Sequence, residues 1–160
     1  MVYKKDYNLS EVAISKISEF KIPVIEKVIP FYEEKYLLEL KIPSINLEKF
    51  VYDVNSSKNN VDYHVEILDS SDLKKNVYFL AGHSGSGSNN YFNDLKLLEI
   101  GDFIYVEKDG LEYCYRVVET YFILKNGYLN VDNNLYDTLF LITCSLDYPD
   151  KQLIIRAKLV

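Results

Sequence analysis

The run Thr138-Leu139-Phe140-Leu141-Ile142-Thr143-Cys144, near the end of the chain, constrains the fold more than any other segment. It is apolar at both odd and even positions, so a strand formed here would be buried on both faces. The run is too short for a typical helix, and its β-branched and aromatic residues favour strands. It therefore predicts a central strand inside a packed β-domain.

Other segments with strand-like periodicity or apolar content predict further strands. They cover residues 36–42, 48–54, 77–81, 102–108, 112–124, 128–131 and 152–160. Asp109-Gly110 predicts a tight hairpin turn, and residues 91–98 predict a short helix. Seven or eight short strands with few helices favour a closed or nearly closed β-barrel, because closure removes edge strands.

The N-terminal segment has a different pattern. Residues 10–20 place apolar side chains at helical spacing and predict a short amphipathic helix, and Pro23 follows it. We therefore expect residues 1–35 to form a helical appendage or linker and residues 36–160 to form the folded domain.

Composition excludes several classes of function. The chain has 160 residues, which suits one domain, and its net charge of −6 comes without the basic stripe of a nucleic-acid binder. It has only two cysteines and two histidines and no CxxC pair, so we predict neither a metal site nor a cofactor. No apolar run approaches the ~20 residues needed to cross a bilayer.

Cys144 is a candidate nucleophile because it ends the buried strand and precedes the polar loop 145–150. A strand end that opens into a loop can present a side chain to a substrate. Two alternatives remain open for this residue. It could be a small core side chain, or it could form a disulfide with Cys114 if the protein is exported.

His83 and Arg156 are candidate partners for this thiol. His83 follows the strand at 77–81, and an imidazolium beside a sulfur favours the thiolate and can later protonate a leaving amine. Arg156 lies in mid-strand, and its guanidinium could bind a developing oxyanion. The alternatives are a turn histidine that caps the backbone and a surface arginine. His64 is interpreted as an exposed loop or helix-edge histidine outside the site, and the alternative is a second active-site histidine.

The same residues carry a resemblance to the sortases, the cysteine transpeptidases of Gram-positive cell surfaces. Leu141-Ile142-Thr143-Cys144 matches the last four positions of their TLxTC-like signature, although the opening threonine falls on Phe140. Ala81-Gly82-His83 lies upstream and Arg156 lies in the following strand, as in the family. Leu40-Lys41-Ile42-Pro43-Ser44-Ile45 and the stretch from Tyr91 to Asp102 resemble further family segments. The likeness covers residues 36–160 in family order.

This resemblance implies an all-β fold, an eight-stranded sortase-like barrel with one or two short helices. It implies that Cys144 is the nucleophile, that His83 is the general acid and base, and that Arg156 stabilises the oxyanion and the substrate. It also implies that Thr143 contacts the substrate or the oxyanion.

The implied reaction is cleavage of the Thr–Gly amide in an LPxTG-like sorting signal of a secreted protein, through a thioester. An amine from a peptidoglycan precursor or from a pilin lysine then accepts the acyl group. Family membership further implies a site on the extracellular face of the membrane and an N-terminal anchor upstream of residues 10–20. The alternative from the residues is a non-catalytic extracellular β-barrel binding module.

Overall fold

The computed structural model describes residues 35–160, and the helix predicted at residues 10–20 lies outside this range. The strands are β1 (Leu38–Ile42), β2 (Leu47–Val51), β3 (Glu66–Ile67), β4 (Val77–Ala81), β5 (Phe103–Lys108), β6 (Leu111–Leu124), β7 (Thr138–Cys144) and β8 (Lys151–Leu159). Three short 3₁₀ helices lie between them: η2 (Pro43–Ile45), η3 (Leu73–Lys75) and η4 (Asn93–Leu97). Within residues 35–160, no helix has the length and apolarity to span a membrane.

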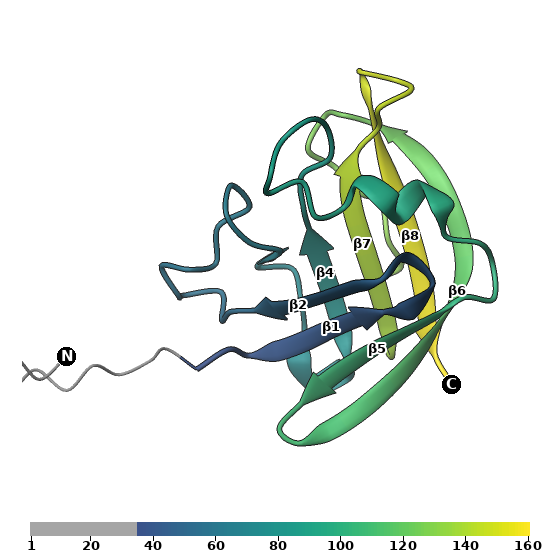
Figure 1. Cartoon of the computed structure of the whole chain (residues 1–160). Helices are drawn as coiled ribbons and strands as arrows, with labels where there is room; N and C mark the ends of the chain where they lie inside the picture. The colour runs from purple at the N-terminus through teal and green to yellow at the C-terminus, as the bar shows by residue number, and fades with distance from the viewer. Residues whose placement is uncertain (1–34) are drawn as a thin grey trace, which may run out of the picture. The chain divides into compact units, whose positions relative to one another are not determined.

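All eight strands form one sheet in the order β2-β1-β5-β6-β8-β7-β4-β3, which curves into a nearly closed barrel (Figure 1). Neighbouring strands are antiparallel, except that β4 and β7 are parallel. In a parallel pair, the carboxyl ends of both strands meet at the same edge of the sheet. The loops after β4 and after β7 therefore start side by side, although the two strands are far apart in the sequence.

Most of the strands agree with the sequence prediction. The Asp109-Gly110 turn is confirmed, since both residues have positive φ (53° and 75°), as a type I′ hairpin turn requires. The strand predicted at 128–131 is wrong, because this stretch of the β6–β7 connection is irregular. β3 and η3 were not predicted, because each is too short for its residues to show a period.

The interior of the barrel is filled by alternate residues of the central strands. Its members from β4, β7 and β8 are Tyr78, Leu80, Leu139, Leu141, Leu153, Ile155 and Ala157. All of them are at most 7% exposed, as expected for the inward face of a small barrel. Leu153, Ile155 and Ala157 therefore share the inward face of β8.

The opposite face of these strands carries a second group of buried residues, which we call the outer apolar cluster. It consists of Val77, Phe79, Phe140, Ile142 and Ile154. The rings of Phe79 and Phe140 stack with centroids 4.7 Å apart. Leu129 and Leu135, from the β6–β7 connection, pack against the cluster. This cover explains why the sequence of β7 is apolar on both faces.

Two buried tyrosines inside the barrel give a prediction about stability. The ring of Tyr78 packs edge-on against Tyr115 at a centroid distance of 6.3 Å. The Tyr115 hydroxyl donates to the carbonyl of Asn76 at 3.1 Å, whereas the Tyr78 hydroxyl finds no partner among residues 35–160. Because an unpaired buried hydroxyl is costly, Tyr78→Phe should raise the free energy of unfolding by about 1 kcal/mol. Tyr115→Phe should lower it by about 1 kcal/mol.

Burial also raises the pKa of Tyr78 from 10.0 to about 12. The folded protein then holds this proton at pH values where the unfolded chain releases it, so the contribution of Tyr78 to stability is constant below pH 10 and falls between pH 10 and 12. Chemical denaturation across this range measures the effect. Tyr78→Phe should reduce the alkaline slope, and an unchanged slope would contradict the assignment.

Candidate functional site

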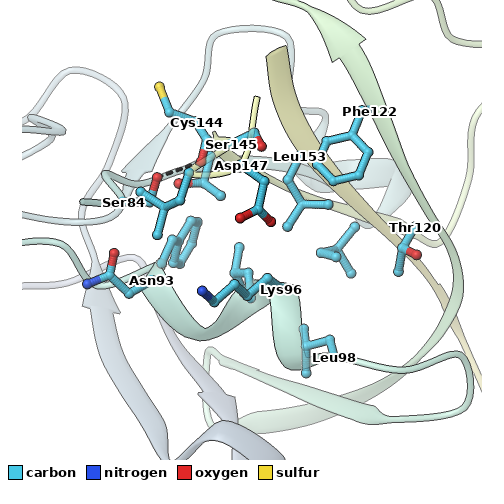
Figure 2. Close-up of a pocket in the computed structure, with 15 residues that line it drawn as sticks. Ser84, Asn93, Lys96, Leu98, Thr120, Phe122, Cys144, Ser145, Asp147 and Leu153 are labelled. Atoms are coloured by element: carbon cyan, nitrogen blue, oxygen red, sulfur yellow. Dashed lines mark hydrogen bonds between the residues drawn. The ribbon is translucent and has the colours of Figure 1, made fainter. Parts of the chain in front are cut away.

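Cys144 ends β7 at the rim of the barrel, and its side chain is half-buried. The Ser84 hydroxyl donates to the Cys144 carbonyl at 2.5 Å, which ties the end of β7 to the loop after β4 (Figure 2). The sulfur points away from the other side chains drawn in Figure 2. By strand alternation, Cys144 shares a face with Ile142 and Phe140, which belong to the outer apolar cluster. The thiol therefore faces the outside of the barrel.

His83 reaches the same place through the parallel pairing of β4 with β7. Ala81 pairs with Ile142, and His83 and Cys144 each lie two residues further along their strands. The Gly82 N–H donates to the carbonyl of Ile142 at 3.1 Å, so the pairing continues beyond β4. Because the side-chain period of a strand is two, the imidazole and the thiol emerge on the same face of the sheet.

The backbone between β4 and His83 is held on its inner side. The Thr143 hydroxyl, whose residue is only 4% exposed, donates to the carbonyl of Gly82 at 2.7 Å. A Cβ atom at Gly82 would lie 2.8 Å from the ring of Phe92, so only glycine fits this contact. The Thr143 hydroxyl therefore helps to hold the backbone that carries His83.

Asp62 is the acidic partner of His83. Its Oδ1 lies 2.9 Å from the His83 Nε2 atom, and both side chains are largely exposed to solvent. A carboxylate oxygen accepts hydrogen bonds, so this contact favours a hydrogen on the Nε2 atom and holds the orientation of the imidazole ring. Asp62 could not be predicted as this partner from the sequence, because residues 55–76 show no period that would bring it to His83.

Arg156 does not lie beside Cys144, in contrast to the arrangement expected from the sequence. In the β7–β8 pair, Cys144 is opposite Gln152 and Arg156 is opposite Phe140. Four residues of β8 separate Arg156 from Gln152, or about 13 Å of strand. The Arg156 Nη1 atom donates to Glu119 on β6 at 3.0 Å. The guanidinium therefore lies on the same face as the thiol but further along the strand.

One pocket lies at the end of β7, and a second lies further back along the same strand. The first, which we call the mouth pocket, has a volume of about 200 Å³, and Asn93, Lys96 and Asp147 contribute to its wall (Figure 2). The second, which we call the outer pocket, has a volume of about 420 Å³ and is lined by residues that include Phe140 and Arg156. Because Phe140 shares a face with Cys144, the outer pocket lies on the thiol side of the sheet.

Cys114 is remote from this site. Its carbonyl accepts a hydrogen bond from the Val160 N–H, so it lies beside the end of β8, whereas Cys144 pairs with Gln152 near the start of β8. Eight residues of strand span about 26 Å, far more than a disulfide allows. Both cysteines are free thiols. The disulfide alternative is therefore wrong.

The remaining histidine and the acidic residues form no candidate metal site in the described part of the chain. The ring of His64 packs edge-on against Tyr52 at a centroid distance of 5.2 Å. No group of three or more His, Cys, Asp or Glu side chains within residues 35–160 could hold a metal ion.

The sequence of this chain matches a known protein family. The family model described as "Sortase domain" matches residues 40–160. The chain belongs to the sortase family. Sortase A of Bacillus anthracis is 27% identical over 162 residues, which cover 99% of this chain and 77% of that protein.

Solved sortases share the fold. A lid mutant of sortase A from Corynebacterium diphtheriae superposes with a TM-score of 0.67 at 24% identity, covering 80% of this chain and 72% of the other. Sortase C from Streptococcus pneumoniae gives a TM-score of 0.68 at 22% identity, covering 80% and 70%. This sortase is therefore a cysteine transpeptidase, and its family acts at the surface of Gram-positive cells. The binding-module alternative is not supported.

Proposed function

We propose that this sortase cleaves an LPxTG-like sorting signal through a thioester on Cys144, with His83 as the general acid and base. The parallel pairing of β4 and β7 carries the proposal, because it brings these two side chains to one face at one edge of the barrel. Asp62 fixes the imidazole from the solvent side. His83 and Cys144 are far apart in the sequence, so the pairing of these two strands is what brings the imidazole and the thiol together.

The reaction follows from these groups. His83 takes the proton of the Cys144 thiol, and the sulfur attacks the carbonyl carbon of the scissile amide. When the tetrahedral intermediate collapses, the C–N bond breaks and His83 donates the proton to the departing amine. An incoming amine then attacks the thioester, passes a proton to His83, and releases the sulfur. One amide is exchanged for another, and no cofactor is consumed.

The outer face of the sheet suggests how the signal binds. An extended peptide advances about 3.4 Å per residue, so the four residues Leu-Pro-x-Thr before the scissile amide span about 13 Å. The same length of strand separates Cys144 from the position of Phe140, which lines the outer pocket. The leucine end of the signal would then reach the outer pocket, where Arg156 contributes to the wall.

We infer the partners from the same proposal. The acyl donors are secreted proteins with an LPxTG-like signal, and the acceptor is an amine of a peptidoglycan precursor or of a pilin lysine. The solved Streptococcus pneumoniae sortase C is described as informative on pilin substrate specificity, which makes a pilin acceptor worth testing here. The enzyme would act on the extracellular face of the membrane, held there by an N-terminal anchor.

A library of internally quenched pentapeptides that varies each position of LPxTG tests the proposal. We expect cleavage between threonine and glycine, with the strongest selection at the leucine and proline positions, because these would occupy the outer pocket and its approach. Adding triglycine, or a lysine-containing pilin peptide, should convert the hydrolysis product into a transpeptidation product. If no library member is cleaved, or if cleavage falls at random amides, the proposed sorting function is wrong.

A further inference from the structure

Gln152 is the residue of β8 that lies opposite Cys144. The Ser145 N–H donates to the carbonyl of Lys151 at 3.0 Å, which makes Ser145 and Lys151 a hydrogen-bonded pair. Hydrogen-bonded and non-hydrogen-bonded pairs alternate along an antiparallel ladder, so Cys144 and Gln152 form a non-hydrogen-bonded pair. Such pairs have Cα atoms about 4.5 Å apart and the closest side chains.

The side chain of Gln152 also lies on the reacting face. Residues directly opposite each other in a sheet project to the same side, so Gln152 projects to the side of the Cys144 thiol. Ile154, two residues further along β8, belongs to the outer apolar cluster together with Ile142. Both Gln152 and Cys144 are half-buried, so a bound peptide could reach them.

None of the cations on β8 occupies this position. Lys151 is adjacent in sequence and therefore projects to the other side of the strand, and its Nζ lies 4.9 Å from the centroid of the Tyr148 ring. Arg156 is bound to Glu119, and Lys158 donates to the Thr138 hydroxyl at 2.6 Å. The backbone N–H that follows the nucleophile, that of Ser145, already donates to Lys151.

We propose that the Gln152 side-chain amide is the hydrogen-bond donor to the scissile carbonyl at Cys144, in the role that the sequence suggests for Arg156. When the sulfur attacks, the carbonyl π electrons move to oxygen, and an N–H of the Gln152 amide donates to that oxyanion. Arg156 binds the substrate further upstream, in the outer pocket. This inference rests on the proposed function, since it assigns a donor to the same reaction.

A neutral donor has a measurable consequence. Hydrogen bonds from charged donors are roughly twice as strong as those from neutral donors, and a cation beside a sulfur favours the thiolate. Gln152→Arg should therefore raise the rate of acylation by about 5- to 10-fold at neutral pH. Iodoacetamide, which needs no sorting signal, should also alkylate Cys144 faster in this variant.

The decisive experiment compares kcat and KM, measured with the library peptide that the unmodified enzyme cleaves fastest. Gln152→Ala should lower kcat by about 100-fold or more with KM nearly unchanged, as expected for the loss of an oxyanion donor. Gln152→Glu keeps the size of the side chain and removes its N–H donor, so this substitution should lower kcat by at least as much. Arg156→Ala should instead raise KM. Lys151→Ala, a neighbouring substitution on the other side of the strand, should leave both constants unchanged.

Three results separate this inference from the proposed function. If the peptide is cleaved in a Cys144-dependent reaction but Gln152→Ala keeps the full kcat, the inference is wrong and the sorting function stands. If Arg156→Ala loses kcat while Gln152→Ala does not, the arginine is the donor after all. If no peptide is cleaved by the unmodified enzyme, the proposed function fails and this assignment fails with it. Thermal melting of each variant checks that the barrel is folded.

Discussion

Replacing Cys144 with alanine is expected to lower turnover of a sorting peptide by about 10⁴-fold or more. The side chain supplies the bond to the acyl group, so its loss removes the covalent route completely, and losses of this size or greater follow removal of a nucleophile in other acyl-transfer enzymes. The residue is half-buried at the end of β7, so the substitution should leave the barrel intact. Steady-state cleavage and transfer to an added amine both measure the effect.

The matched control is Cys114→Ala. This second thiol is also half-buried, but it lies near the far end of β8, beside Val160. Its loss should leave kcat/KM within about twofold of the unmodified enzyme, because surface substitutions away from a site change little. Equal activity of Cys144→Ala and the unmodified enzyme would place catalysis elsewhere.

The second large effect is expected at His83. Removing a general acid and base costs about 10²- to 10⁴-fold in rate, and His83→Gln keeps a similar size and polarity without the ability to exchange a proton at neutral pH. The loss should fall mainly on kcat, because the imidazole acts on the thiol and on the departing amine. Single-turnover release of the amine product measures this step directly.

His64→Gln provides the comparison, since His64 is the other histidine of the chain. Its ring packs on Tyr52 and lies outside the paired ends of β4 and β7. We expect its activity to equal that of the unmodified enzyme. A His83→Gln variant that retains full kcat, or a His64→Gln variant that loses it, would reverse the assignment of the general acid and base.

The strands could be predicted from the sequence because their apolar residues alternate, or run together where both faces are buried. Thr138–Cys144 is the clearest example: the interior of the barrel covers one face, and the outer apolar cluster, under the β6–β7 connection, covers the other. The proximity of His83 to Cys144 is expected from the chemistry of the two residues and from the family resemblance, and periodicity alone does not predict it. In the structure it depends on the parallel pairing of β4 with β7, which joins segments with no local signal for each other.

The position of Arg156 illustrates a property that the periodicity of a strand cannot predict, which is its register with the neighbouring strand. The alternation of side chains along β8 places Arg156 on the face opposite to Leu153 and Ile155. It could not show which residue of β8 lies opposite Cys144, because the turn between β7 and β8 sets that register. The turn closes with Ser145 bonded to Lys151, and this register brings Gln152 to the thiol. Asp62 could not be predicted for a related reason, because it lies in an irregular loop that contacts His83.

The central claim is that the substrate becomes covalently attached to one particular sulfur. The most direct test is to mix the enzyme with its best sorting peptide, stop the reaction in acid within the first turnovers, and measure the mass of the intact protein and of its proteolytic fragments. We predict a thioester adduct with the mass of the acyl part of the peptide, located on the fragment that contains Cys144 and lost on treatment with hydroxylamine. Turnover without an adduct, or an adduct on Cys114, would contradict it.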